Sequence, residues 1–224
     1  MTSRLDGRSA AVADERAEQI LVAACRAIVR LGFASTRIAD VAREAGTSTG
    51  TVHYYFETKD DLLVAALRWA NTRPYDRLDG MIDPADDATT KIARLIEFSV
   101  PYPGRGRDDW VLWLEFWNRA LLRPELLEES EKVERRWRSY FFRIVREGVE
   151  SGEFKPVAPP DEVAERLIAL VNGLGIAAVA ERTAIDPERF RELTFRFISE
   201  QLALSVQKLH ARAAAVAAEA TTAP

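Results

Sequence analysis

The apolar residues of this chain recur with the helical period of about 3.6 residues along almost the whole of its 224-residue length. Val, Ile and Thr do not gather into the alternating runs that β-strands need, and most Gly and Pro residues separate the periodic segments. With 47% hydrophobic and 29% charged residues, a chain of this length can bury a full core without disulfides. The sequence therefore predicts an all-α fold.

Turn and capping signals divide the chain into successive helices. Gly32 and Gly46 each follow an apolar periodic segment, and Asp186-Pro187 has the N-cap acid and first-turn proline of a helix start. We predict helices over 14–31, 38–45, from 48 or 49 to 56, from 58 to a kink or end at Pro74, and over 84–100, 109–122, 124–150, 160–181 and 187–209. The Ala-rich residues after about 209 have little to pack against, so we expect this tail to fray.

Several classes of protein are disfavoured by what the sequence lacks. Cys25 is the single cysteine, and His53 and His210 are the only histidines, so neither a disulfide nor a metal site is expected. The longest nearly apolar run, residues 167–180, is too short to cross a bilayer, and residues 1–13 lack the apolar core of a signal peptide. We therefore expect a cytoplasmic protein. Without a visible nucleophile–base pair or phosphate loop we expect no cofactor, and a helical enzyme is a minor alternative.

The segment from Thr36 to Leu63, TRIADVAREAGTSTGTVHYYFETKDDLL, predicts two short helices joined by a tight turn. Gly46 supplies the positive φ that lets the chain reverse between them. A helix-turn-helix needs this brevity, because one helix enters the major groove of DNA while the other braces it. The small core that fixes the angle between the two helices would consist of Ile38, Val41, Ala42, Ala45, Val52 and Phe56.

The outward side of the second of these helices carries side chains suited to DNA. Its hydroxyl and imidazole groups can bond phosphates and base edges, and Gly50 permits a close approach of the backbone. The outward residues are Thr47, Ser48, Thr49, Thr51, His53, Tyr54, Tyr55 and, just beyond the helix, Lys59. One of the tyrosines, Tyr55 in the first place, could instead pack partly in the core. Because the net charge is −4, and the first 60 residues carry eight basic and eight acidic side chains, DNA binding has to come from this local face.

The stretch from Asp14 to Leu67 resembles the TetR family of transcriptional regulators. The resemblance rests on the first predicted helix, the Gly32-Phe33 link, IADVAREAGTSTGTVHYYF and the following TKDDLL. It implies that residues 48–55 form the recognition helix. It also implies phosphate contacts from Thr36, Arg37, Tyr54 and Lys59. His53 stands where many members have a tyrosine, which leaves a base edge or a phosphate as its partner.

The same resemblance implies how the chain is organised and what it does. Residues 1–60, ordered from about 14, would form the DNA-binding domain, residues 61–209 a helical effector-binding and dimerisation domain, and residues 210–224 the tail. The expected function is a repressor that binds a palindromic operator and is released by a small molecule, with the helix from Thr58 to Pro74 as the lever. An activator or a ligand-independent regulator with the same DNA-binding domain is the alternative.

A homodimer is expected because one recognition helix reads too few bases for a selective operator. The resemblance implies that the last two long helices, residues 160–181 and 187–209, form a four-helix interface between the two copies. Small residues would permit a close approach there: Ala169, Gly173, Gly175, Ala177 and Ala178. A monomer that uses the same apolar faces as core is the alternative.

Aromatic residues gather on one predicted helix, where Trp110, Trp113 and Trp117 recur at i, i+3 and i+7. The segment WLEFWNRALLRPEL is similar to the C-terminal domain of the choline-responsive BetI-type subgroup. This similarity indicates a cationic or amine-like effector, since tryptophan faces and a carboxylate favour cations. The candidate ligand-binding residues are Phe98, Tyr102, Trp110, Trp113, Phe116, Trp117, Trp137, Tyr140, Phe141 and Asn172, with Glu115 and Asn118 as further polar groups. For each aromatic residue the alternative is an ordinary place in the core.

Overall fold

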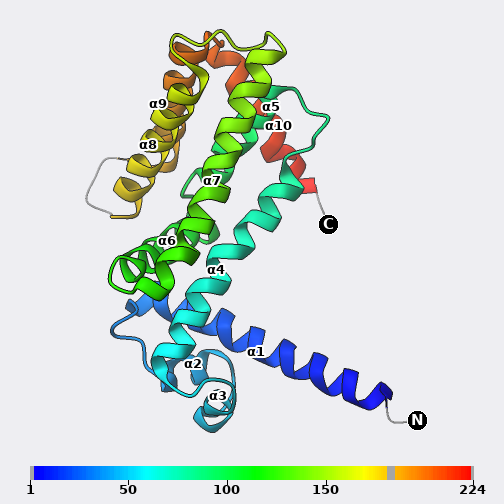
Figure 1. Ribbon diagram of the computed structural model, residues 1–224, viewed down its shortest axis with the longest axis vertical. Coiled ribbons are helices and arrows are strands. Elements are labelled where there is room, and N and C mark those ends of the chain that lie inside the picture. Colours follow the sequence, from blue (N-terminus) through cyan, green and yellow to red (C-terminus); the bar gives the residue numbers. More distant parts are fainter. Residues whose placement is uncertain (1–2, 181–184, 223–224) are drawn as a thin grey trace. The chain divides into compact units, whose positions relative to one another are not determined.

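Figure 1 shows the computed structural model, which describes residues 3–180 and 185–222, with side chains over 15–180 and 185–215. Across these ranges the chain is helical and contains no β-strand, so the predicted all-α fold is confirmed. The helices are α1 (Ser3–Leu31), α2 (Ile38–Glu44), α3 (Thr49–Tyr55), α4 (Lys59–Met81), α5 (Ala88–Ser99), α6 (Arg105–Ala120), α7 (Pro124–Glu150), α8 (Pro160–Val179), α9 (Pro187–Leu202) and α10 (Val206–Thr222).

The chain divides into two compact units. The head unit contains the chain up to Arg73 together with Val111–Leu122, and the body unit contains Pro74–Trp110 and the chain from Arg123 onward. The head unit therefore reaches beyond the boundary predicted at residue 60. The reason is burial, because the first turns of α4 place Leu62, Leu63 and Leu67 in the apolar interior.

The interior of the head unit is built mainly from α1 and the first part of α4. Cys25 is buried, as its apolar surroundings suggest, and its thiol donates to the carbonyl oxygen of Ala66 at 3.4 Å. Asn71 is also buried, and its amide donates to the carbonyl oxygens of Leu67 at 2.8 Å and Leu112 at 3.4 Å. The fully or almost fully buried residues include Ile20, Ala24, Ala27, Ile28, Val41, Ala42, Val52, Leu62, Leu63, Ala66 and Leu67. The predicted core positions Ile38, Ala45 and Phe56 are half-buried.

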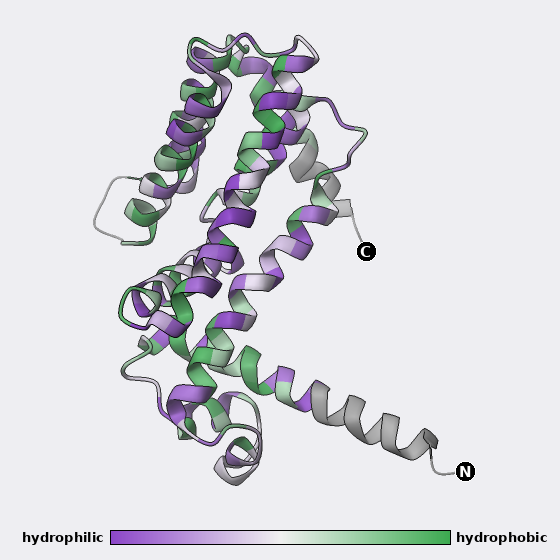
Figure 2. Ribbon diagram, in the orientation of Figure 1, coloured by the Kyte–Doolittle hydropathy of each residue, from purple (hydrophilic) through white to green (hydrophobic). Residues whose placement is uncertain are grey.

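The core of the body unit lies among α5, α7, α8, α9 and α10. The α7 helix packs against α8 and α5, α8 packs against α9, and α10 packs against α5 (Figure 1). Phe141, Phe190 and Phe195 are the largest side chains that are fully buried in this core. Figure 2 shows that these helices carry both hydrophobic and hydrophilic residues, as expected of amphipathic helices that cover a common interior.

The end of the chain differs from the prediction. The predicted helix over 187–209 is interrupted, because α9 ends at Leu202 and Ala203 adopts a left-handed conformation with φ of 53°. Ser205 then begins α10 by accepting the N–H of Lys208 on its hydroxyl at 3.3 Å. The residues after 209, which we expected to fray, continue this helix to Thr222. Burial of Leu209 supplies packing that the sequence pattern did not reveal.

Other helices begin or end at residues that differ from the predicted ones. Asp87 accepts the N–H of Thr90 at 2.6 Å and so starts α5 later than the predicted residue 84. The α4 helix continues through Pro74 to Met81, although Pro74 cannot donate the usual N–H to the carbonyl oxygen of Ala70. Helix α1 begins at Ser3 rather than near residue 14. Helix α8 ends at Val179, and the predicted end at residue 181 lies outside the described residues.

The described ranges contain neither a membrane-spanning helix nor a cluster of metal-binding side chains. None of the helices there combines the length and the apolar character that crossing a membrane requires. In the same part of the chain, no three or more His, Cys, Asp or Glu side chains come together as a potential metal site.

Candidate DNA-binding surface and aromatic sites

The turn between α2 and α3 has the geometry expected of a helix-turn-helix. Gly46 has φ of +60°, which is the left-handed conformation predicted for it. The hydroxyl of Ser48 caps α3 by accepting the N–H of Thr51 at 3.0 Å, and the two hydroxyls lie 2.9 Å apart. Val52 faces inward and is fully buried. The cap and this single apolar anchor fix the orientation of a seven-residue helix.

The opposite side of α3 is open to solvent. Thr49, Gly50, His53 and Tyr54 are exposed, and 81% of the Tyr54 side chain surface is accessible. Tyr55 is half-buried, and its ring meets that of Tyr54 edge-on with centroids 5.0 Å apart. The exposed residues recur one helical turn apart, so they form one outward face on the side of α3 opposite Val52. The hydroxyls of Ser48 and Thr51 are already engaged with each other at the start of the helix.

The link between α1 and α2 contains two of the other predicted DNA-binding residues, Thr36 and Arg37, and a third, Lys59 of α4, binds to it. Arg37 is exposed at the start of α2, and its backbone N–H is bound by Asp40 Oδ2 at 3.1 Å. Lys59 is half-buried, and its Nζ donates to the carbonyl oxygen of Ala34 at 2.7 Å. Thr36 differs from the prediction of a phosphate contact. It is fully buried, and its hydroxyl donates to the carbonyl oxygen of Gly32 at 2.8 Å.

Helix α6 also contacts this link, through its residues in the head unit. Glu115 Oε1 accepts the backbone N–H of Phe33 at 3.3 Å, and the guanidinium carbon of Arg119 lies 3.6 Å from the centre of the Phe33 ring. Glu115, which the sequence suggested as a polar group near a ligand, is therefore engaged with the helix-turn-helix. Arg119 was not indicated by any local pattern, because its partner is far away in sequence.

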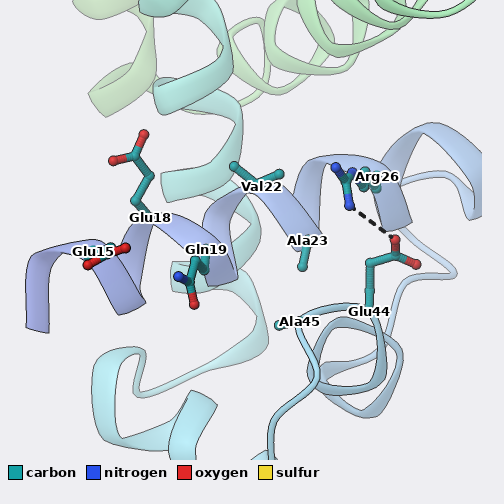
Figure 3. A pocket seen from close by; sticks show the side chains of 8 residues that line it. All are labelled: Glu15, Glu18, Gln19, Val22, Ala23, Arg26, Glu44 and Ala45. Atoms are coloured by element: carbon teal, nitrogen blue, oxygen red, sulfur yellow. Dashed lines mark ion pairs between the residues drawn. The ribbon is translucent and has the colours of Figure 1, made fainter. Parts of the chain in front are cut away.

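A cavity of about 450 Å³ lies between α1 and α2 of the head unit (Figure 3). Its polar lining is mainly acidic, and the ion pair between Arg26 and Glu44, at 3.8 Å, borders it. The lining residues are Glu15, Glu18, Gln19, Val22, Ala23, Arg26, Glu44 and Ala45. None of these belongs to α3, and carboxylates repel phosphates. This cavity is therefore not part of the candidate DNA-binding face.

The predicted ligand-binding residues fall into both units. Trp113, Phe116 and Trp117 belong to the head unit. Phe116 is only 2% exposed and is a core residue, whereas Trp113 and Trp117 stack on each other with centroids 5.9 Å apart. The body unit contains Phe98, Tyr102, Trp110, Trp137, Tyr140, Phe141 and Asn172.

The two tryptophans of the body unit, Trp110 and Trp137, each donate a hydrogen bond from the indole N–H. Trp110 Nε1 donates to the carbonyl oxygen of Ser99 at 2.8 Å, and its indole lies so close to Gly175 that a Cβ there would come within 2.3 Å of it. Gly175 therefore makes room for Trp110. Trp137 Nε1 donates to Asn172 Oδ1 at 3.3 Å, which brings together two of the predicted ligand-binding residues.

Phe141 and Tyr140, two of the predicted ligand-binding residues, make contacts within the body unit. Phe141 is fully buried and meets the Trp137 ring edge-on, with centroids 4.8 Å apart. The Tyr140 hydroxyl donates to Asp79, and this hydrogen bond is the largest contribution that lowers the pKa of the Asp79 carboxyl. The hydroxyl of Tyr102 donates to Glu97 Oε2 at 2.8 Å, and burial together with this bond raises the pKa of Tyr102 to about 12.

An ion pair that no sequence pattern indicated lies beside Phe98. Arg77 Nη2 donates to Asp109 Oδ2 at 2.7 Å, and the guanidinium carbon of Arg77 is 4.9 Å from the centre of the Phe98 ring. Both charged side chains are partly buried, with 34% of the Arg77 and 28% of the Asp109 surface exposed. Burial raises the pKa of the Asp109 carboxyl, and the hydrogen bond from Arg77 only partly opposes this effect.

Two family models match this chain. The model described as bacterial regulatory proteins of the tetR family matches residues 20–66, which include the helix-turn-helix. The model described as the C-terminal domain of BetI-type transcriptional repressors matches residues 88–203, about half of the 224 residues. The chain belongs to the TetR family. As its sequence predicted, this member of the TetR family is a DNA-binding transcriptional regulator, and its C-terminal domain is of the BetI type.

Relatives extend the similarity over most of the chain. The regulator BetI 1 of Chromohalobacter salexigens is 28% identical over 200 residues, which cover 85% of this chain and 92% of that protein. BetI of Escherichia coli K12 is 27% identical over 192 residues, covering 84% and 94%. A transcriptional regulator from Saccharomonospora viridis, solved in complex with choline, is 34% identical with a TM-score of 0.79, covering 84% and 98%. These relatives are regulators, and neither matching family model describes an enzyme.

Proposed function

We propose that this TetR regulator is a repressor that binds a palindromic operator as a homodimer and is released by a small quaternary ammonium compound. The observation that carries the DNA-binding part is the outward face of α3. Thr49, Gly50 and His53 are exposed on one side of a short helix that Val52 anchors from the other side. Thr49 and His53 offer groups that can bond base edges, while Arg37, Tyr54 and Lys59 would contact phosphates.

The proposed dimer forms through α8 and α9 of two copies. On α8, Ala169 and Gly173 are exposed, and Ile176 is 38% exposed. On α9, Leu193 and Phe197 are one helical turn apart and only half-buried. A face of this kind favours association with an identical face across a two-fold axis. Gly175, by contrast, is proposed to serve the packing of Trp110 rather than the dimer.

Replacement of Ile176 by Glu tests the proposed dimer. The charge would be buried in the interface, so the variant is expected to elute as a monomer at concentrations where the unmodified protein is a dimer. Loss of the dimer would also lower the affinity of this variant for the operator. Arg135→Gln, which changes an exposed side chain of α7, is the control. A dimer of unchanged stability in Ile176→Glu would contradict the assignment of the interface.

The proposed effector site lies in the body unit. The regulator from Saccharomonospora viridis was solved with choline, and it shares 34% of its residues with this chain. Tryptophan and phenylalanine faces attract cations, and the body unit has Trp110, Trp137 and Phe98 as partly or largely buried aromatic residues. Asn172 and Tyr102 are the predicted residues that would complete the site. The regulator would act in the cytoplasm, where operator DNA is accessible.

The effector proposal is tested by titrating choline, and separately 3,3-dimethylbutan-1-ol, into the protein while operator binding is measured. The alcohol has the shape of choline but no charge. The proposal predicts that choline weakens operator binding and that the alcohol does not. Equal effects of both compounds would contradict a cation-selective site. Choline binding that strengthens operator occupancy would indicate an activator or a corepressed regulator instead.

A further inference from the structure

We infer that the face of Phe98 and the carboxylate of Asp109 form an ammonium-binding site, which Arg77 of α4 occupies until a cationic effector displaces it. The inference rests on the proposed function, because it assigns the site and the mode of action of the same effector. All three residues belong to the body unit, and they come from three different helices, α4, α5 and α6.

The contacts of Arg77 are those that a protein offers to a quaternary ammonium ligand. A cation within about 6 Å of a ring centre is attracted by the π-electrons, and an adjacent carboxylate neutralises its charge. Arg77 lies 4.9 Å from the Phe98 ring centre and 2.7 Å from Asp109 Oδ2, so one guanidinium makes both contacts. The protein thus already holds a cation of its own in this place.

The ring and the carboxylate are held in place independently of Arg77. Phe98 precedes Ser99, and Asp109 precedes Trp110, and these two neighbours are joined by the 2.8 Å bond from Trp110 Nε1 to the carbonyl oxygen of Ser99. Gly175 of α8 packs against the same indole. Arg77, in contrast, reaches the site on a long side chain from a different helix. It is therefore the member of the cluster that can leave.

The chemistry of Asp109 limits what can replace Arg77. The carboxylate is partly buried, and burial raises its pKa, so the ion needs a compensating charge nearby. Departure of Arg77 without a replacement would take away the hydrogen-bonded cation of a partly buried anion and leave it only the longer-range attraction of Arg105. A neutral ligand of the same shape would not compensate it, whereas a quaternary ammonium would restore both the charge and the contact with the ring. The ligand class is therefore a small organic cation.

The consequence concerns α4, which begins at Lys59 in the head unit and carries Arg77 in the body unit. The bond from Arg77 to Asp109 attaches α4 to α6. The Arg77 guanidinium also covers the ring of Phe98 on α5. A ligand shifts an equilibrium only by its differential affinity for the two states. Competition for one site supplies that difference, because the effector and Arg77 cannot occupy it together. Effector binding would thus release α4 from this contact.

The test uses the full-length chain with Arg77→Gln, Arg77→Lys and Asp109→Asn. Arg135→Gln is the matched control, because it removes an arginine from an exposed ion pair with Glu131 on α7. Choline and tetramethylammonium binding are measured by calorimetry, and operator affinity is measured with and without choline. Thermal melting of each variant verifies that it is folded.

Removal of the internal competitor should tighten choline binding by on the order of tenfold in Arg77→Gln, since the site no longer has to be vacated. Its operator affinity without choline should fall toward that of the unmodified protein with choline. Asp109→Asn should bind choline at least tenfold more weakly, and Arg77→Lys should lie between Arg77→Gln and the unmodified protein. If the Arg77–Asp109 ion pair only stabilised the fold, breaking it would not tighten choline binding.

Two results would overturn the inference, and they separate it from the proposed function. If choline weakens operator binding by the unmodified protein, but Arg77→Gln binds choline no more tightly, the proposed effector stands and the role of Arg77 is wrong. If neither choline nor tetramethylammonium binds to the unmodified protein or to Arg77→Gln, both the cationic effector and this site are wrong.

Discussion

Lys59 donates a hydrogen bond of 2.7 Å to the carbonyl oxygen of Ala34, so the first residue of α4 is tied to the link between α1 and α2. An ammonium group has three N–H donors, and this contact uses one of them. The remaining donors can bind a DNA phosphate while the link stays in place. Lys59 is therefore proposed to combine two tasks, bracing the helix-turn-helix and anchoring the backbone of DNA.

Replacement of Lys59 by Ala should weaken binding to operator and to random duplexes by similar factors. A phosphate contact carries no sequence information. Its loss should make the negative slope of log K against log salt shallower by about one. Binding is measured for both duplexes over a series of salt concentrations. Lys132→Ala, an exposed lysine on α7 in the body unit, is the control. A loss confined to the operator would assign Lys59 to base recognition instead.

Replacement of Thr49 or His53 by Ala should change which DNA sequence is preferred. These side chains lie on the exposed face of α3, and loss of a good base contact costs about 1–3 kcal/mol at the base pair concerned. Selection of bound duplexes from a randomised pool, carried out for each variant, measures the preference. Base-reading roles for both residues would be excluded by two variants that select the same site as the unmodified protein.

Replacement of Gly175 by Ala should destabilise the body unit by about 1–3 kcal/mol, because an added Cβ would come within 2.3 Å of the Trp110 indole. Choline binding should weaken as well, since Trp110 would be displaced. Gly80→Ala is the matched control, because a Cβ at this exposed position of α4 meets no atom within 4 Å. It should leave stability unchanged or raise it by up to about 1 kcal/mol. Equal denaturation midpoints for the two variants would contradict the close contact.

Glu153 should make stability depend on pH. Its carboxylate accepts the backbone N–H groups of Ala88 and Thr89, at 3.0 and 3.2 Å, and the Thr89 hydroxyl at 2.9 Å. Burial raises the pKa of Glu153, but these three bonds together outweigh it, so the pKa lies below the ordinary value of 4.5. The stabilisation is therefore fully present above pH 4.5 and is lost as the pH falls through the lowered pKa of the folded state.

Glu153→Gln isolates this contribution from those of other carboxyl groups. The variant should be less stable than the unmodified protein by about 1–2 kcal/mol at neutral pH, because the amide offers one acceptor in place of two charged ones. The difference should shrink between neutral pH and an acidic pH at which the Glu153 carboxyl of the folded protein is protonated, because both side chains are then neutral. Urea denaturation at the two pH values measures it. A difference that is the same at both would rule out a lowered pKa for Glu153.

The parts of the fold that depend on local chemistry could be predicted from the sequence. Gly46 needs a positive φ, and Ser48 needs only the N–H three residues ahead of it, so the turn and the cap of α3 follow from neighbouring residues. Helix α7 has the predicted ends, Pro124 and Glu150, because a first-turn proline opens it and Gly152 follows it. The resemblance of residues 14–67 to the TetR family is confirmed by the family model, which matches residues 20–66.

The parts that depend on distant partners could not be predicted. Thr36 looked available for DNA, but its burial is decided by the packing of the whole head unit. Tyr140 looked like part of an aromatic pocket, yet Asp79, far away in sequence, binds its hydroxyl. Arg77 and Asp109 belong to separate helices, and no pattern in the sequence around either residue indicates that they form an ion pair. Periodicity identifies an apolar face but does not say which residue covers it.

The central claim is that the outward face of α3 recognises an operator under the control of a cationic ligand. The most direct measurement is selection of duplexes from genomic DNA by the full-length protein, followed by titration of choline against the selected site at fixed salt. We expect a palindromic site that binds two copies of the chain and is released as the choline concentration increases. Equal affinity for random competitor at low ionic strength, or operator binding that choline leaves unchanged, would contradict it.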